Sequence, residues 1–335
     1  MILHPGVLAL LASSLATLFF LAVACGVGWQ VLRRWDYRSS SPGQLALERR
    51  TYLVSAVMNY ALGLGVLSGF LFLHTADDLH RLLVGAMCAT GSLNANPVGW
   101  WALASKASLL FAAGLWICLN RLDQQAENAP LTRLKYALLL PLAPLVLLDA
   151  GLLIVYFLGI HPDVITSCCG SLFSAGSGSG LASTLAAFPA VPSLWLFYGG
   201  CGLYAGAGAA CLRWPAGRWR ALLGMLAVVM LGVSLTALVS VFSMYFYELP
   251  THHCPFDILQ AGYGYIGYPV YGALALWALG GFDRRAQGRV ATQGLEQGGE
   301  HAAQRRHVLW SLLAMAAFIV LVTWPVVFGA FRLVR

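Results

Sequence analysis

Residues 136–160 read YALLLPLAPLVLLDAGLLIVYFLGI and contain one charged side chain, Asp149. The stretch is longer than the roughly 20 apolar residues that a helix needs to cross the hydrocarbon core of a bilayer. Inside hydrocarbon every backbone N–H and C=O group must be paired within the protein, which a helix achieves along its own length. This stretch therefore predicts a transmembrane helix, and with it the fold class of the chain.

Similar apolar runs occur on both sides of this stretch, and the whole chain has the composition of a membrane protein. Hydrophobic residues make up 59% of the sequence and charged residues 10%, against roughly 25% charged residues in soluble domains. We predict an all-α polytopic helical bundle, a single transmembrane domain over residues 1–335 with about eight spanning helices. The polar segment 282–307 is predicted to be a flexible cytoplasmic linker. The predicted spans are 6–32, 51–73, 98–120, 136–160, 186–212, 221–247, 263–281 and 308–331.

Lysine and arginine residues are concentrated in alternate loops, and this pattern predicts the orientation of the spans. Loops with an excess of basic residues remain in the cytoplasm. Both termini and the other loops are then expected on the periplasmic side of a bacterial-type inner membrane. The basic residues of the cytoplasmic loops are Arg33, Arg34, Arg38, Arg49, Arg50, Arg121, Arg133, Lys135, Arg213, Arg218, Arg220, Arg284, Arg285, Arg289, Arg305 and Arg306.

The net charge of +7 is explained by this insertion signal. We therefore expect the lipid bilayer as a partner and no nucleic acid. No nucleotide is expected either. Residues 262–267, GYGYIG, match the dinucleotide-binding fingerprint by letters, but no strand precedes them and the required βαβ context is missing.

Three of the predicted outer loops, residues 74–96, 161–180 and 248–262, combine histidine with cysteine. Thiols and imidazoles gathered on one side of a membrane indicate disulfide bonds, thiol redox chemistry, a soft metal ion or haem. The residues concerned are His74, His80, Cys88, His161, Cys168, Cys169, His252, His253 and Cys254.

One interpretation of the loop cysteines is structural. Thiols on the oxidising side of a membrane tend to form disulfides. A bond between Cys168 and Cys169 is disfavoured, because neighbouring Cα atoms are about 3.8 Å apart and a disulfide prefers about 5.5 Å. We expect Cys88 and Cys254 each to bond to one member of that adjacent pair.

A second interpretation is a thiol–disulfide relay with Cys254, Cys168, Cys169 and Cys88 as its catalytic residues. Residues 254–257, Cys-Pro-Phe-Asp, resemble half of a Cys-x-x-Cys redox motif, with Asp257 at the second position. His252 and His253 are placed to activate the Cys254 thiol. The chemistry is similar to that of vitamin K epoxide reductase-type membrane oxidoreductases, which implies a quinone cofactor and a periplasmic redox protein as partner.

A third interpretation is binding of a soft metal ion such as copper, supplied by a periplasmic metal-carrier protein. Thiolate and imidazole ligands suit such ions, and the predicted ligands are His252, His253, His161, His74 and Cys254. A haem b held by two of the histidines at helix ends, among His74, His161 and His252, is a further alternative. No zinc-type Cys-x-x-Cys pair is present in the sequence.

Two charged residues lie inside predicted spans at similar depth, Lys106 and Asp149. A lone charge in hydrocarbon is costly, so we expect the two side chains to pair. The predicted function is an inner-membrane protein whose periplasm-facing Cys/His cluster handles thiol–disulfide redox or a soft metal ion. The alternatives are a small-solute or ion permease that uses the Lys106 and Asp149 pair, and a non-catalytic subunit of a respiratory complex.

Overall fold

The computed structural model describes residues 3–36, 39, 41–125, 131–161, 186–214, 216–291 and 299–332. All regular secondary structure among these residues is helical, as the composition predicts. The contacts group the chain into two compact units. The sequence predicts a single membrane domain and contains no signal for this division.

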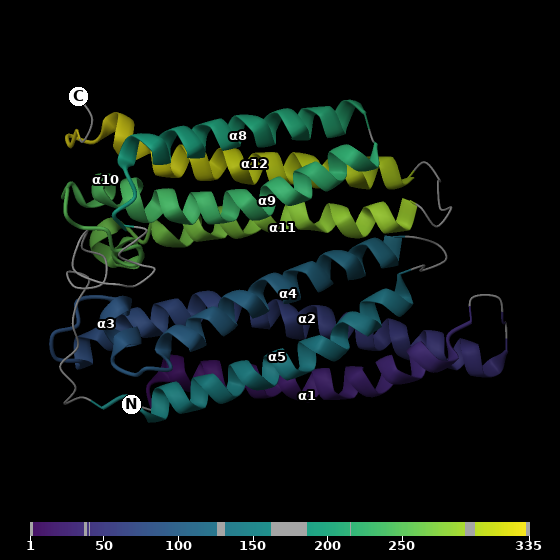
Figure 1. Cartoon of the computed structure of the whole chain (residues 1–335). Helices are drawn as coiled ribbons and strands as arrows, with labels where there is room; N and C mark the ends of the chain where they lie inside the picture. The colour runs from purple at the N-terminus through teal and green to yellow at the C-terminus, as the bar shows by residue number, and fades with distance from the viewer. Residues whose placement is uncertain are drawn as a thin grey trace. The chain divides into compact units, whose positions relative to one another are not determined.

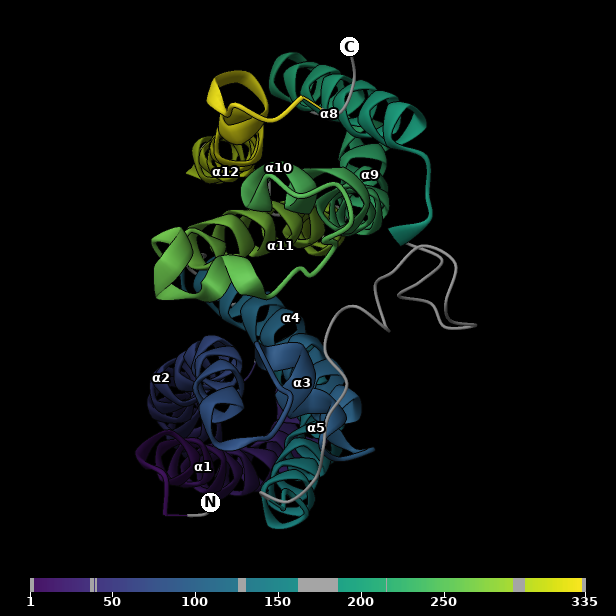
Figure 2. The ribbon, with the colours of Figure 1, turned by 90° about the vertical axis from the view of Figure 1, so that its left-hand side faces the viewer.

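Unit 1 comprises Met1–Ala76 and Leu93–Val164. Its long helices are α1 (Pro5–Arg34), α2 (Pro42–Asp78), α4 (Gly99–Gln125) and α5 (Thr132–Leu158). Helix α5 packs along α1 and α4, and the end-on view of Figure 2 shows the four helices side by side. The core takes one large side chain or more from each helix, including Leu21, Met58, Trp116 and Leu139.

Unit 2 comprises Asp77–Ser92 and Ile165–Arg335, so the segment that follows α2 belongs to it. Its long helices are α8 (Ala190–Arg213), α9 (Gly217–Ala237), α11 (Gly267–Ala291) and α12 (Gly299–Phe328), which run alongside one another in Figure 1. Helix α9 packs on α8 and α11, and α11 packs on α12. Edge-to-face and tilted contacts among Phe197, Phe242, Phe318 and Trp277 fill its core.

Short elements between the long helices position the candidate site. Helix α9 continues through the π-helical turn η2 (Leu238–Phe242) into α10 (Ser243–Tyr247). The 3-10 turns η1 (Leu79–Leu82), η3 (Asp257–Leu259) and η4 (Ala261–Tyr263) and the short helix α3 (Ala89–Asn94) complete the described helices.

Six helical segments are long and apolar enough to cross a membrane: Pro5–Arg34, Pro42–Leu82, Gly99–Gln124, Thr132–Leu158, Gly217–Tyr247 and Arg305–Phe328. The chain is thus an all-helical protein of membrane-embedded character. Helices α8 and α11 coincide with two further predicted spans, 186–212 and 263–281. These two helices are not among the six segments.

Several helices continue beyond the predicted apolar spans. Helix α2 begins at Pro42, nine residues before the predicted start of its span at residue 51. Helix α11 ends at Ala291 and α12 begins at Gly299, so helix occupies much of the predicted 282–307 linker. Hydropathy marks where the apolar stretch ends, whereas a helix continues as long as its residues tolerate the conformation.

Candidate functional site

The centre of the candidate site is a pair of thiols in unit 2. Cys88 directly precedes α3, and Cys254 lies in the loop between α10 and η3. Their Sγ atoms are 3.5 Å apart although the residues are 166 positions apart in sequence. Both side chains are fully buried. The separation is longer than the S–S bond of about 2.05 Å, so the two cysteines are not bonded to each other.

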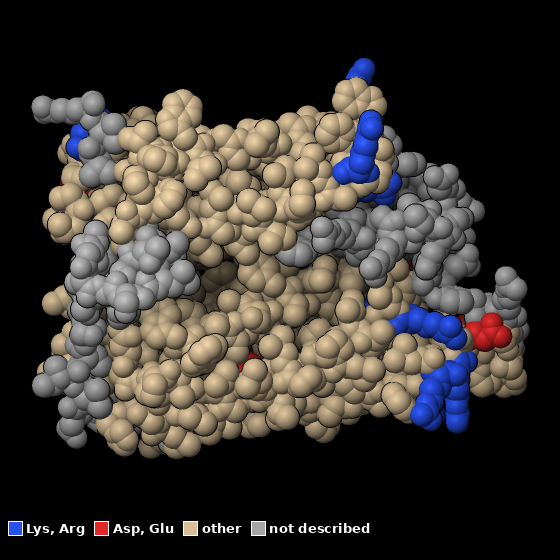
Figure 3. Space-filling view, in the orientation of Figure 1, with Lys and Arg blue, Asp and Glu red and all other residues tan. Residues whose placement is uncertain are grey.

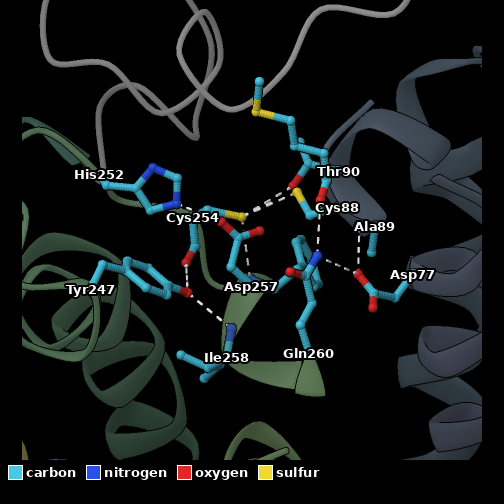
Figure 4. Close-up of polar contacts among 12 residues, drawn as sticks. Asp77, Cys88, Ala89, Thr90, Tyr247, His252, Cys254, Asp257, Ile258 and Gln260 are labelled. Carbon is cyan, nitrogen blue, oxygen red and sulfur yellow. Dashed lines mark hydrogen bonds and ion pairs between the residues drawn. The ribbon is translucent and has the colours of Figure 1, made fainter. Parts of the chain in front are cut away.

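Two polar groups contact the sulfur atom of Cys254. The backbone N–H of Phe256 donates a hydrogen bond to Sγ at 3.4 Å. The hydroxyl of Thr90, two residues after Cys88, lies 3.5 Å from the same sulfur. Figure 4 shows Thr90 beside the two thiols. A sulfur atom surrounded by N–H and O–H groups retains polar partners despite complete burial, which suits a thiol that takes part in chemistry.

Asp257 brings a carboxylate to the two thiols. One of its oxygens lies with the two Sγ atoms in a group whose members are all within 4.8 Å of one another. Its Oδ2 is 2.6 Å from Nε2 of His252, whose side chain is 31% exposed. Its Oδ1 is buried and has no hydrogen-bond partner among the described residues. A carboxylate that lies between two thiols and a half-buried histidine is arranged to accept a proton from a thiol and to pass it through the histidine towards solvent.

The environment of Asp257 favours its charged form. Burial alone raises the pKa of this carboxyl, but the hydrogen bond from His252 and the polar contacts with the Cys88 and Cys254 thiols outweigh it. The net pKa is lower than the ordinary value of an aspartate. The side chain is therefore a carboxylate at neutral pH.

Asp77 and Gln260 hold the backbone on both sides of Cys88. The Asp77 Oδ1 atom accepts a hydrogen bond from the Ala89 N–H at 3.2 Å and another from Gln260 Nε2 at 3.2 Å. Gln260 Nε2 also donates to the Met87 carbonyl at 2.9 Å. These bonds attach the residues before and after Cys88 to the loop that follows η3, on the side of Cys254, as Figure 4 shows.

The loop that carries Cys254 is fixed by α10 and by the π-helical turn. The hydroxyl of Tyr247 donates to the Cys254 carbonyl at 2.6 Å and accepts from the Ile258 N–H at 3.1 Å. His253 Nδ1 bonds the carbonyl of Val239, in η2, at 3.0 Å. A π-helical turn leaves backbone carbonyls available for such contacts and is often found at functional sites. Cys254 is therefore held in place from both sides.

The structure brings together some of the sequence-predicted residues and separates others. Cys88 and Cys254 meet each other, while Cys168 and Cys169 lie outside the described residues. No two cysteines among the described residues are at disulfide distance. His252 bonds Asp257, and His253 bonds a backbone carbonyl. His74 and His161 are exposed residues of unit 1. Among the described residues the group with ligand geometry is Cys88, Cys254 and Asp257, which includes Cys254 from the predicted metal ligands.

The structure pairs the two predicted intramembrane charges inside unit 1. Lys106 Nζ is 2.8 Å from Asp149 Oδ2 and donates to Ser68 Oγ at 3.1 Å. Ser105 donates to Asp149 Oδ1 at 3.0 Å. Lys106 and Asp149 are almost fully buried. Every charged atom of the pair has a partner, which is the condition for burying charge in an apolar interior.

A second buried ion pair was not predicted. Lys135 Nζ lies 2.6 Å from Asp123 Oδ2, and Asn120 and Thr132 complete the group with bonds of 3.1 and 3.0 Å. In the sequence, Lys135 is one of the basic residues that indicate the orientation of the spans. The polar residues Asp77, Thr90 and Gln260 were also missed, because nothing in the sequence distinguishes them from ordinary loop residues.

Comparison of the chain with protein-family models, with curated proteins and with solved structures finds no match in any of the three.

Proposed function

We propose that the protein is a multi-pass inner-membrane protein with eight spans, with both termini and the thiol centre on the periplasmic side. The six apolar helical segments support membrane insertion, and α8 and α11 have the length of two more spans. The face drawn in Figure 3 shows few charged side chains along the middle of the helices of each unit, and the visible Lys and Arg side chains lie towards helix ends. This distribution is typical of proteins that follow the positive-inside rule.

The function proposed for this membrane protein is thiol–disulfide exchange at Cys88 and Cys254. The observation that carries it is the 3.5 Å separation of two buried sulfur atoms whose residues are 166 positions apart in the chain. A chance meeting of two cysteines would not require the hydrogen bonds of Asp77, Gln260 and Tyr247, which fix both cysteine-bearing segments. The site therefore has the organisation of a redox couple.

The exchange reaction balances without a further cofactor. One thiol gives its proton to Asp257 and attacks one sulfur of a disulfide substrate, which releases the first thiolate and forms a mixed disulfide. The second thiol then attacks the cysteine sulfur of the mixed disulfide and releases the second thiolate. The two protons end on the released thiols, so a dithiol and a disulfide give a disulfide and two thiols. Asp257 and His252 provide the proton path.

Burial restricts the substrate that can reach the couple. Neither sulfur atom is exposed to solvent, so a small disulfide is a better co-reactant than a folded protein unless one cysteine-bearing segment moves. We therefore choose glutathione as the probe.

The experiment equilibrates the purified full-length protein in glutathione buffers of graded ratio, without metal. Remaining thiols are then trapped with a maleimide, and the cysteine-containing peptides are mapped by mass spectrometry. The expected result is a reversible transition in which the Cys88 and Cys254 peptides become linked. Cys88→Ser and Cys254→Ser each abolish it, and Cys25→Ser in unit 1 serves as the control. The proposal is overturned if both cysteines stay reduced throughout, or if each is permanently bonded to Cys168 or Cys169.

A further inference from the structure

The thiol pair and Asp257 together have the composition of a metal site. The three side chains provide two sulfur atoms and one carboxylate oxygen, all within 4.8 Å of one another. The three residues come from two segments that are far apart in sequence, and their positions are fixed by the hydrogen bonds of Asp77, Gln260 and Tyr247. A fixed cluster of mixed sulfur and oxygen donors is the arrangement that borderline and soft cations prefer.

The distance between the sulfur atoms fits a bound ion better than it fits a disulfide. With Zn–S bonds of about 2.3 Å and tetrahedral angles, two thiolates on one zinc ion lie about 3.8 Å apart. The observed separation is 3.5 Å. A bound ion therefore requires the sulfur atoms to move by only a few tenths of an ångström, whereas the S–S bond of about 2.05 Å requires them to approach much further.

The second observation is the Oδ1 atom of Asp257. This oxygen is buried and no N–H or O–H group among the described residues bonds it; the other polar groups in contact with the carboxyl are the Cys88 and Cys254 thiols. A buried carboxylate oxygen whose polar neighbours are two sulfur atoms is placed to share a bound cation with them. The other oxygen, Oδ2, is held by His252 at 2.6 Å. A ligating carboxylate that is oriented by a hydrogen bond to its second oxygen is a common feature of metal sites.

We propose that Cys88, Cys254 and Asp257 bind one divalent cation of the zinc type when both thiols are reduced. The donor set excludes Mg²⁺ and Ca²⁺, which take oxygen ligands only. Three protein ligands leave the fourth tetrahedral position for water. The inference rests on the same two thiols as the proposed exchange reaction. Oxidation of the pair by a disulfide removes two of the three ligands and releases the ion, so binding and the disulfide exclude each other.

The test uses the full-length protein in detergent, reduced, stripped with a chelator and titrated with ZnCl₂ against a chromophoric chelator. The expected result is uptake of one equivalent. Cys88→Ser and Cys254→Ser abolish uptake, and Asp257→Asn weakens the affinity about tenfold or more. The matched controls are Asp78→Asn, a half-exposed carboxylate of unit 2 that pairs with Arg81, and Cys25→Ser, a thiol of unit 1; both retain wild-type affinity.

A spectroscopic measurement on the wild-type protein keeps the proposal testable if a variant fails to fold. Co²⁺ in place of Zn²⁺ is expected to produce the near-ultraviolet charge-transfer band of thiolate ligands, and oxidation with a disulfide is expected to remove it reversibly. Absence of that band from reduced, Co²⁺-loaded protein overturns the proposal, as does zinc uptake that survives both cysteine substitutions.

The two proposals fail in different ways. Formation of the Cys88–Cys254 disulfide in metal-free glutathione buffers without zinc uptake by the reduced protein overturns the metal site alone. Zinc uptake by a pair that never forms a disulfide overturns the exchange reaction alone.

Discussion

Asp257 controls the charge of the thiol centre, because it is the carboxylate closest to both sulfur atoms and to His252. Its pKa is lower in the folded protein than the ordinary value. A carboxyl with a lowered folded-state pKa stabilises the fold at pH values above its unfolded pKa, about 3.9, and this stabilisation is lost as the pH falls through the folded pKa. Protonation of this side chain should therefore contribute to the loss of stability of unit 2 in acid.

Asp257→Asn is predicted to lower the free energy of unfolding at neutral pH by about 2 kcal/mol, the value of a hydrogen bond to a charged group. Below about pH 4 the stability of this variant should decrease less steeply with falling pH than that of the wild-type protein. Thermal unfolding in detergent measures both effects. The pH is varied from about 3 to about 8, so that it spans the ordinary pKa of an aspartate. Asp78→Asn, which removes a half-exposed carboxylate of unit 2, is the control. Identical acid profiles for wild type and Asp257→Asn would contradict this account.

Gln260 is predicted to position Cys88 for bond formation. Gln260→Ala removes the contacts with Asp77 and the Met87 carbonyl, so the reduced thiol gains freedom that the disulfide must remove again. The equilibrium constant for the Cys88–Cys254 disulfide in glutathione buffers should fall about tenfold, which corresponds to roughly 1.4 kcal/mol. Gln44→Ala in unit 1, where the amide also donates to a carboxylate, should leave it unchanged. Equal shifts in both variants would show that Gln260 has no positioning role.

At the scale of helices, two buried ion pairs join α4 and α5, and each helix contributes the lysine of one pair and the aspartate of the other. Helix α4 contributes Lys106 and Asp123, and α5 contributes Asp149 and Lys135. In the antiparallel arrangement each lysine meets an aspartate, whereas a parallel arrangement would bring like charges to the same level. Because a buried charge without a partner is costly, the two pairs together specify the direction and the register of this helix hairpin.

The pair of Lys106 and Asp149 is predicted to be coupled in stability. Lys106→Met alone leaves the Asp149 carboxylate buried beside an apolar side chain and should cost about 3–5 kcal/mol. The double variant Lys106→Met with Asp149→Leu should recover most of this loss, because it removes both charges. Denaturant unfolding in detergent gives the free energy of unfolding of the wild type, the two single variants and the double variant. Ser108→Ala on the exposed side of α4 is the control. If the double variant is as unstable as the sum of the single variants, the two side chains do not act as a pair.

The same helices show what the sequence does and does not reveal. The contact of Lys106 with Asp149 could be anticipated, because two isolated charges at similar depth in apolar segments have few other partners. The Asp123–Lys135 pair could not, because both residues lie at the ends of their helices, where hydropathy treats a charge as solvated. The meeting of Cys88 with Cys254 was also beyond the sequence. It depends on hydrogen bonds between loops far apart in the chain, for which no periodic pattern exists.

At the scale of the whole molecule, the apolar runs predicted the long helices well, since backbone pairing in hydrocarbon leaves no other choice. They did not predict the division into two units or the membership of Asp77–Ser92 in unit 2. Hydropathy reports on the preference of a segment for lipid, whereas the grouping of helices depends on side-chain packing. Hydropathy alone also does not decide whether α8 and α11 cross the membrane. Their length has to be considered together with their apolar content.

Helices α8 and α11 contain 24 and 25 residues. At 1.5 Å per residue each is more than 35 Å long, enough for a hydrocarbon core of about 30 Å. We therefore predict that both cross the membrane. Reporter fusions that are active only in the periplasm, placed after Gly159 and after Trp214, test α8; fusions after Gln260 and after Ala291 test α11. In each pair of fusions the first should be active and the second inactive. Equal activity within a couple would mean that the intervening helix does not cross, and inverted activity would place the thiol centre in the cytoplasm.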